Sequence, residues 1–317
     1  MMSKALAAVT FGEPMAMFIA NEPGELSEVE SFTRALAGAE SNVAIGLRRL
    51  GHPTGYVTKL GNDNLGAFIR RTQEREGLDT SRMSVSPDRP TGILMKSKVL
   101  SGDPKVEYFR KNSAASTLGP ADFDEAYFAG ARHLHATSIS AALSDSMREF
   151  SFRAMEFMRK QGRTVSFDPN LRPVLWPDRE TMVRTIHELA ARSDWFFPGV
   201  GEGKLLTGSD DPEKIADFYL DLGVQFVAVK IGPEGAYYKS REEAGFVPGF
   251  KVDEVVDTVG AGDAFAAGVI SGMLEGLSLA ASVRRGNALG ALAVMSPGDM
   301  DGLPTRDELE RFLAGRS

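Results

Sequence analysis

Short apolar runs alternate with amphipathic segments along most of the chain, and this alternation restricts the fold more than any other feature. Residues 134–138, 164–168, 195–198 and 226–231 are apolar runs of strand length, with room for a helix between successive runs. The apolar start, residues 5–10, has the same character. Strands that alternate with helices form a mainly parallel sheet with helices on both faces, so the sequence predicts an α/β fold.

Residues typical of helix starts mark the expected helices. Ser146 and Glu149 have the spacing of a capping box before an apolar run, and Thr305 and Glu308 have the same spacing. Pro212 stands where a first helical residue is expected. Ligands of such a sheet bind at the carboxyl ends of its strands, so we expect the functional residues in the loops that follow the apolar runs.

Two segments interrupt the alternation. Residues 15–32 and 91–110 combine strand-like residues with charges and turn formers. We predict that they form a small β lid, drawn from about residues 13–36 and 88–112, on a single domain that spans residues 1–317. No linker rich in proline, glycine and serine divides the chain. Edge strands of the main sheet are the alternative interpretation of both segments.

The charge and the cysteine content exclude several classes of protein. A formal net charge of -7 at pH 7 argues against extended contact with nucleic acid or with an anionic membrane, since both require a positive surface. The absence of cysteine excludes thiolate nucleophiles and cysteine-based zinc sites. No segment has the composition of a membrane span or of a signal peptide. We therefore expect a cytoplasmic protein whose partners are small molecules.

The segment 257–265, which reads Asp-Thr-Val-Gly-Ala-Gly-Asp-Ala-Phe, carries the strongest chemical signal. Small residues at a helix start expose backbone N–H groups at the positive end of the helix dipole, where a phosphate can approach closely. Asp263 would repel such an anion unless it has another task. A carboxylate beside a transferring phosphoryl group can accept the proton of an attacking hydroxyl, so the segment indicates a general base. A plain helix cap is the alternative.

Residues 257–265 resemble the signature of the ribokinase-like (PfkB) carbohydrate kinases, which transfer the γ-phosphoryl group of ATP to a sugar hydroxyl. Residues 37–44, followed by Leu50 and Gly51, are similar to the family's substrate-side glycine and asparagine motif, with Ala37 in the place of its first glycine. The resemblance covers most of the chain. It implies a three-layer α/β/α sandwich with a mainly parallel central sheet and a small β lid, and the activity of an ATP-dependent carbohydrate kinase.

The same resemblance implies roles for individual residues. Asp263 is the catalytic base, and the amides of Gly260, Ala261 and Gly262 form the anion hole. The residues beside the nucleotide are Lys230, Gly232, Gly235, Gly260, Gly262 and Asn287. The substrate-binding residues include Gly38 and Asn42. Asn287 approaches the adenine by resemblance, whereas its position inside a helix favours a local hydrogen bond.

The resemblance also implies MgATP as the phosphoryl donor. The stretch 198–208 is similar to the family's Asn-x-x-Glu motif, in which Glu202 places Mg²⁺ through waters and Gly199 stands in the position of the asparagine. The helix dipole favours an acid near a helix start in any case, which is the alternative explanation for Glu202. The resemblance leaves open whether a monovalent cation binds near Asp257.

The substrate-side residues indicate a sugar acid. Family members that phosphorylate neutral sugars carry an aspartate on the first lid strand, and Met17 stands in that position here, where a thioether cannot replace bidentate recognition of hydroxyls. The segments 108–116 and 168–173 resemble those of the family's 2-keto-3-deoxygluconate kinases. Arginine pairs with a carboxylate through a planar bidentate fork, so Arg110 and Arg172 are the candidates for carboxylate binding.

Further substrate contacts are expected from Tyr108, Asp168 and Asn170. In the alternative interpretation the ring of Tyr108 packs on its strand, and Asp168 and Asn170 are structural residues at a strand end. The corresponding alternatives are a solvated charge for Arg110 and an ion pair with a neighbouring aspartate for Arg172.

Together these observations predict a kinase that converts 2-keto-3-deoxygluconate to 2-keto-3-deoxy-6-phosphogluconate. The alternatives are a kinase for fructose, ribose or 5-keto-2-deoxygluconate, a non-catalytic sugar-binding regulator, and a nicotinamide-dependent dehydrogenase, whose dinucleotide fingerprint would need a βαβ context. His133 and His135 share a strand face without a third ligand, so we expect packing there and not metal binding. An exposed lid edge, together with the resemblance, predicts a homodimer or a higher homo-oligomer.

Overall fold

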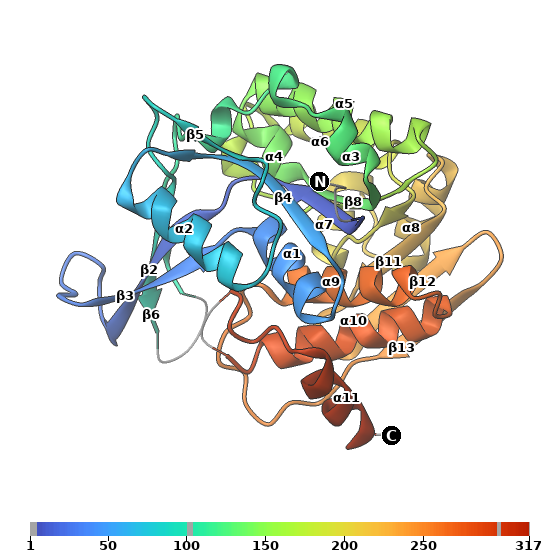
Figure 1. The fold of residues 1–317 in the computed structure, drawn as a ribbon. Helices are drawn as coiled ribbons and strands as arrows, with labels where there is room; N and C mark the ends of the chain where they lie inside the picture. Colours follow the sequence, from blue (N-terminus) through green and yellow to red (C-terminus); the bar gives the residue numbers. More distant parts are fainter. Residues whose placement is uncertain (1–4, 100–103, 297–298, 317) are drawn as a thin grey trace.

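A nine-stranded sheet runs through the protein in the order β13-β12-β11-β10-β9-β8-β1-β4-β5 (Figure 1). The computed structural model describes residues 5–99, 104–296 and 299–316. The strands are β1 Leu6–Phe11, β4 Thr54–Gly61, β5 Met83–Ser86, β8 Ala131–Thr137, β9 Thr164–Asp168, β10 Trp195–Phe196, β11 Phe226–Lys230, β12 Gly235–Ser240 and β13 Ala244–Pro248. The strands from β11 to β5 are parallel, and β12 and β13 extend the sheet as antiparallel strands.

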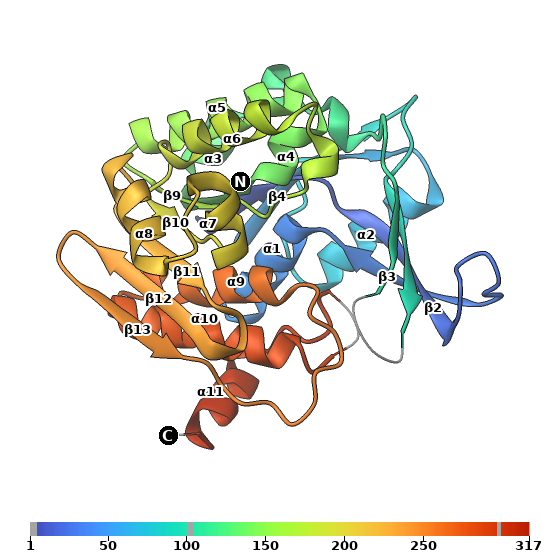
Figure 2. The same cartoon turned by 180° about the vertical axis from the view of Figure 1, so that it is seen from behind.

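Helices cover both faces of this sheet (Figures 1 and 2). One layer consists of α3 Glu125–Ala129, α4 Ser138–Leu143, α5 Asp145–Lys160, α6 Arg179–Ala190, α7 Val200–Thr207 and α8 Pro212–Asp221, which share one hydrophobic cluster with the sheet. The other layer consists of α1 Ala39–Arg49, α2 Asn64–Arg75, α9 Ala261–Leu274, α10 Leu279–Ala293 and α11 Arg306–Ala314, which share a second cluster. This confirms the predicted α/β/α sandwich. Within the described residues, no helix combines the length and the apolar content that a membrane crossing requires.

The small residues in and after the glycine turn allow two helices to pack closely. A Cβ atom at Gly268 of α9 would lie 2.7 Å from the Cα atom of Gly286 on α10, which is closer than real Cβ contacts. The backbones of α9 and α10 therefore touch directly, and α9 is held rigidly against the sheet. This packing fixes the direction in which the first turn of α9 points.

The expected helix starts are correct with one exception. Pro212 is the first residue of α8, and Thr305 and Glu308 form the capping box of α11. The capping box predicted at Ser146 is wrong: α5 begins at Asp145, and the hydroxyl of Ser144 accepts the hydrogen bond from the Met147 amide. Ser144 Oγ also donates to the carbonyl of Ser116, a contact that local sequence does not reveal.

The two segments that interrupt the alternation form a sheet of their own, called here the small sheet. Its order is β3-β2-β6-β7, with β2 Met15–Pro23, β3 Phe32–Ala37, β6 Ile93–Lys98 and β7 Val106–Phe109. These strands are separate from the nine-stranded sheet and not its edge (Figures 1 and 2). One side of the small sheet carries a buried apolar cluster that consists of Met15, Met17, Ala37 and Leu94.

Candidate active site

A cavity of about 350 Å³ lies between the small sheet and the body of the protein; it is called here the first cavity. Its walls come from segments that are far apart in sequence, including the loop after β9 and the first turn of α9. It brings together the predicted residues Gly38, Tyr108, Arg110, Asp168, Asn170, Arg172, Glu202, Lys230, Gly260, Gly262 and Asp263. Most of the residues chosen from the sequence therefore face one space.

Asp263 lies in the first turn of α9 and is held by two amides. Asn42 Nδ2 donates to Asp263 Oδ2 at 2.9 Å, and Asn170 Nδ2 donates to Oδ1 at 3.1 Å. Burial raises the pKa of Asp263 to about 6, and the nearby charge of Asp299 adds to the rise while the hydrogen bond from Asn42 opposes it. The carboxylate is thus oriented, largely desolvated, and ionised at neutral pH.

A strained backbone position directs Asn170 toward Asp263. Asn170 has a φ of 37°, in the left-handed region that asparagine tolerates better than most residues. The backbone N–H of Asn170 donates to Asp168 Oδ1 at 3.0 Å, which stabilises the turn after β9. Such strain is typical of functional sites, where the surrounding structure holds a side chain in one orientation.

Lys230 supplies a partly buried positive charge beside the turn of α9. Its Nζ atom lies 2.6 Å from Asp168 Oδ2, and a Cβ atom at Gly262 would lie 3.4 Å from Nζ. Burial lowers the pKa of Lys230, but the charges of Asp168 and Glu202 outweigh this effect, so the net pKa lies above its ordinary value and the ammonium stays protonated. Burial raises the pKa of Asp168, against the pull of the ammonium. The Lys230 ammonium is therefore close enough to bind an anion held at Gly262.

Gly260 caps α9 in a conformation that requires glycine. Its φ is 83°, and a Cβ atom there would lie 2.8 Å from the carbonyl oxygen of Asp299. No side chain caps the first turn of α9 among the described residues. The Ala261 amide makes a long hydrogen bond of 3.4 Å to the carbonyl of Thr258. Within the described residues, the amides of Gly260 and Gly262 have no such backbone acceptor, so they can bind an external anion.

Arg172 presents a guanidinium group without an acidic partner in the described part of the chain. Its Nη1 atom donates to the carbonyl of Leu171 at 2.8 Å. The predicted alternative, an ion pair with a neighbouring aspartate, is not what the structure contains, because Asp168 pairs with Lys230 and Asp178 caps α6. Arg172 lines the first cavity and is close enough to lower the pKa of Asp263.

Arg110 also lines the first cavity, but its charge is already compensated. Its Nε and Nη2 atoms both lie 2.6 Å from Oε2 of the fully buried Glu13. The alternative of a solvated charge is wrong for Arg110, which is 8% exposed. Tyr108 lines the same cavity from β7, and its ring centroid is 5.7 Å from the guanidinium carbon of Arg110.

A second cavity of about 370 Å³ adjoins the first and shares Lys230, Thr258 and Gly262 with it. Its walls are mostly apolar and include the predicted residues Gly232, Gly235, Ala261 and Asn287. The side-chain nitrogen of Asn287 donates to the carbonyls of Val247 and Pro248, at 2.9 and 3.1 Å, so it also ties α10 to β13. The two cavities meet at the start of α9.

Glu202 lines the first cavity from α7 and uses both carboxylate oxygens locally. Oε2 accepts the amide of Gly199 at 2.7 Å as a helix cap, and Oε1 accepts the amide of Leu171 at 2.8 Å. Among the described residues, no group of three His, Cys, Asp or Glu side chains is arranged to hold a metal ion by itself. Mg²⁺ retains waters and phosphate oxygens with one or two carboxylates, so Glu202 and Asp168 suit a water-mediated site for a nucleotide-bound ion.

Asp299 is a residue of the first cavity that the sequence analysis missed. It is buried, its Oδ1 atom has no hydrogen-bond partner in the described structure, and burial raises its pKa to about 6. An isolated aspartate in a loop between two helices has no sequence signal, because its environment comes from Asn42 and Lys96, which are distant in sequence. The side chain of Asn42 and the backbone of Gly38 also lie close to this carboxyl group, so Asp299 is a candidate polar group at the wall of the first cavity.

His133 and His135 lie in the sheet and contact hydroxyl groups. The ring of His133 stacks on Trp195, with 4.7 Å between centroids, and its nitrogens contact Thr164 and Ser166. Nδ1 of His135 lies 2.8 Å from the same Ser166 hydroxyl. Both rings therefore pack inside the core, apart from the two cavities.

An α/β/α fold with two cavities that meet at a glycine-rich helix start is typical of an enzyme that transfers phosphoryl groups. The family model described as pfkB family carbohydrate kinase matches residues 6–306, and the chain belongs to this family of ATP-dependent carbohydrate kinases. The chain is 59% identical to the 2-dehydro-3-deoxygluconokinase of Bacillus subtilis (strain 168) over 312 residues, which are 98% of this chain and 96% of the relative. This assignment contradicts the dehydrogenase alternative.

Solved structures show the same fold. A PfkB protein from Polaromonas sp. JS666 superposes with a TM-score of 0.90 at 47% identity, covering 96% of this chain and 99% of that one. A putative Ribokinase II from E. coli in complex with ATP and Mg²⁺ superposes with a TM-score of 0.91 at 29% identity, covering 98% and 99%. ATP and a divalent cation are thus used within the family.

Proposed function

We propose that this protein phosphorylates 2-keto-3-deoxygluconate at its terminal hydroxyl with MgATP. The observation that carries the proposal is the guanidinium of Arg172, which lacks an acidic partner in the described structure and shares a cavity with Asp263. A guanidinium in this position recognises a carboxylate, which a sugar acid has and a neutral sugar lacks. The high identity to a 2-dehydro-3-deoxygluconokinase supports the same substrate.

The small sheet supports a sugar acid over a furanose. The side chains that it turns toward the first cavity include Met15, Met17 and Leu94, which cannot accept hydrogen bonds from vicinal hydroxyls. We therefore assign the polar contacts of the substrate to the body of the protein, with Arg172 for the carboxylate and Asp299 for a hydroxyl. Tyr108, Arg110, Asn170 and Gly38 complete the proposed substrate side.

In the proposed reaction, Asp263 accepts the proton of the terminal hydroxyl, and the resulting oxygen forms a bond to the γ-phosphorus while the bond to ADP breaks. Asn42 and Asn170 hold the carboxylate toward the acceptor. Lys230 and the amides of Gly260, Ala261 and Gly262 neutralise the charge that develops on the phosphoryl oxygens.

The nucleotide is assigned to the second cavity, with its adenine against the apolar wall that includes Asn287. Gly232 and Gly235 line the same space. Glu202 and Asp168 would hold a magnesium ion through water, and the ion would supply charge neutralisation of the phosphates. The small sheet acts as a lid that covers the acceptor and excludes water, which would otherwise hydrolyse ATP.

The proposed substrate predicts a selective activity. Purified protein with MgATP is assayed for ADP release with 2-keto-3-deoxygluconate, gluconate, 5-keto-2-deoxygluconate, fructose and ribose, each against a reaction without sugar. We expect turnover well above the control with 2-keto-3-deoxygluconate alone. Turnover of fructose or ribose instead would leave the kinase chemistry in place and overturn the role of Arg172.

We also propose that the chain forms a homodimer or a higher homo-oligomer in the cytoplasm, where ATP is available. β3 and β7 end the small sheet on either side in the described structure, and an open edge of this kind can pair with a second copy. Phe109 at the end of β7 is 56% exposed, which adds an apolar surface. Sedimentation velocity is expected to show a species of at least twice the chain mass, and a monomer at all concentrations would contradict this assembly.

A further inference from the structure

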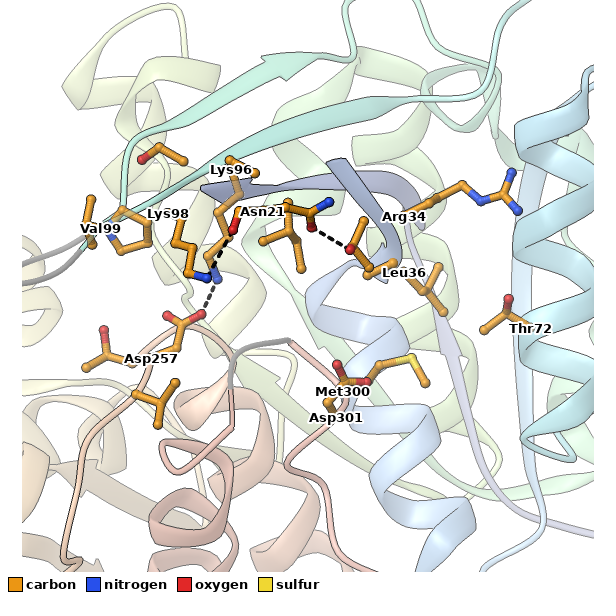
Figure 3. Close-up of a pocket in the computed structure, with 18 of the residues that line it drawn as sticks. Asn21, Arg34, Leu36, Thr72, Lys96, Lys98, Val99, Asp257, Met300 and Asp301 are labelled. Atoms are coloured by element: carbon orange, nitrogen blue, oxygen red, sulfur yellow. Dashed lines mark hydrogen bonds and ion pairs between the residues drawn. The ribbon is translucent and has the colours of Figure 1, made fainter. Parts of the chain in front are cut away.

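Lys96 forms a buried ion pair that joins the small sheet to the body. It lies on β6, it is 3% exposed, and its Nζ atom contacts Oδ2 of Asp257, which belongs to the loop before α9. Figure 3 shows the side chain of Lys96 extending from its strand to Asp257, across a cavity that the neighbouring Lys98 also lines. The pair links residues 161 positions apart in the chain.

Asp257 in turn holds the turn that leads into α9. Its Oδ1 atom accepts the backbone amide of Val259 at 3.0 Å. The amides of Val256 and Asp257 donate to the carbonyl of Val294 at 2.8 and 3.2 Å, which ties this loop to the end of α10. A carboxylate in this position fixes the backbone immediately before Gly260, so it acts on the proposed anion hole through the peptide chain.

A monovalent cation bound near Asp257 would need the Asp257 carboxylate as a ligand. Oδ1 of Asp257 is taken by the Val259 amide, and Oδ2 is taken by the Lys96 ammonium. The ammonium also lies near Asp299, whose pKa it lowers against the effect of burial. A metal ion would have to displace a covalently tethered cation from between two buried acids, so the residues present do not fit a resident monovalent metal ion.

We propose that Lys96 supplies, from the small sheet, the positive charge that neutralises Asp257 and fixes the turn of the anion hole, and that turnover therefore needs no monovalent metal ion. Lys96 is a positioning residue, since it acts through Asp257 and not on the reacting atoms. Because the ammonium belongs to the small sheet, the turn has its compensating charge only when this sheet is seated over the first cavity. The inference rests on the proposed function, because it concerns the anion hole of that reaction.

The first test uses the unmodified protein. Initial rates with 2-keto-3-deoxygluconate and the Tris salt of ATP plus MgCl₂ are measured in a buffer whose monovalent cation is tetramethylammonium, with ADP quantified directly by ion-exchange chromatography. Replacing tetramethylammonium by K⁺, Na⁺ or NH₄⁺ at constant ionic strength is expected to change the rate by less than about twofold. A rise of fivefold or more with K⁺ would overturn the inference, whereas no turnover in any salt would count against the proposed function instead.

The second test removes the charge. In the tetramethylammonium buffer, Lys96→Met is expected to lower kcat by about 10²-fold, as a misplaced catalytic turn does, with a smaller change in the KM for ATP. Adding K⁺ or NH₄⁺ is expected to raise the kcat of Lys96→Met at least tenfold, because either ion can occupy the position of the missing ammonium. Tetramethylammonium is too large to do so.

The matched control is Lys98→Met on the same strand. Lys98 is exposed and donates to the carbonyl of Asn21 within the small sheet, so its loss removes the same charge without touching Asp257. This variant is expected to keep the kcat of the unmodified protein. Circular dichroism and thermal unfolding establish that Lys96→Met is folded. A folded Lys96→Met protein with near-normal kcat, or one that no small cation restores, would overturn the inference, and if the variant does not fold, the cation titration of the unmodified protein decides.

Discussion

Replacing Asp263 by asparagine is expected to lower kcat by about 10²- to 10⁴-fold, which is the usual contribution of a general base. The amide keeps the size of the side chain but cannot accept the proton of the attacking hydroxyl. ATP affinity, measured by isothermal titration calorimetry, should stay within a few-fold or improve, because Lys230 and the amides at the start of α9 remain and a negative charge near the phosphates is lost. Turnover close to normal in the folded variant would refute the role of the base.

If Asp263 is the general base, its ionisation should also determine the pH dependence of the unmodified protein. Burial raises the pKa of Asp263 to about 6, so the ionised base predominates above this pH and is lost below it. The value of kcat/KM is therefore expected to be flat above about pH 7 and to fall tenfold per unit below about pH 6. Asp299 has a pKa raised to about 6 as well, so Asp299→Asn is the control. If Asp263 causes the acid limb, the variant should keep the limb but shift it to lower pH, because the charge of Asp299 contributes to the raised pKa of Asp263. Loss of the limb in Asp299→Asn would contradict this assignment.

Replacing Arg172 by methionine is expected to lower kcat/KM for 2-keto-3-deoxygluconate by about 10²-fold, mostly through KM. Hydrogen bonds to charged groups contribute about 1.5–3 kcal/mol each, and a bidentate pair lies at the upper end of this range. Arg172→Lys should recover only part of the loss, because a lysine provides the charge without the planar fork. Arg110 is a poorer test, since its removal would leave the buried Glu13 uncompensated and destabilise the fold.

Two comparisons separate carboxylate binding from a general effect of Arg172. The methyl ester of the substrate has no carboxylate charge, so its kcat/KM should be low with the unmodified protein and nearly unchanged in Arg172→Met. Arg184→Met, on the exposed face of α6, is the matched control and should behave like the unmodified protein. If Arg172→Met retained kcat/KM for the sugar acid within about threefold, the carboxylate would have to bind elsewhere.

Local patterns were sufficient for the sandwich and for the start of α9. The apolar run 164–168 is the whole of β9, and the glycine turn opens a helix as its small residues indicated. The predicted start of α5 is wrong because Ser144 and Ser146 are both residues that cap helices well. The contact of Ser144 with Ser116 selects between them. Local propensity therefore identified the elements but did not always set their ends.

The candidate site was only partly accessible to the same reasoning. Asp263 could be identified because a carboxylate is unexpected in a turn of the kind that binds phosphate, and that signal is contained in nine consecutive residues. Arg110 and Arg172 were equivalent by sequence, yet one is paired with Glu13 and the other has no acidic partner in the described structure. Asp299 and Lys96 gave no signal, because their surroundings come from other parts of the chain.

The sequence by itself determined the α/β architecture and the glycine turn at the start of α9, since both depend on residues that are close along the chain. Its motifs also resemble those of the family to which the chain belongs. Only the tertiary structure decided which charges are compensated: Lys230 with Asp168, Lys96 with Asp257 and Arg110 with Glu13. The physical reason is that the effect of a charge depends on its burial and on its nearest partner in space. Both are set when distant segments pack together, and the same packing leaves Arg172 beside Asp263 in one cavity.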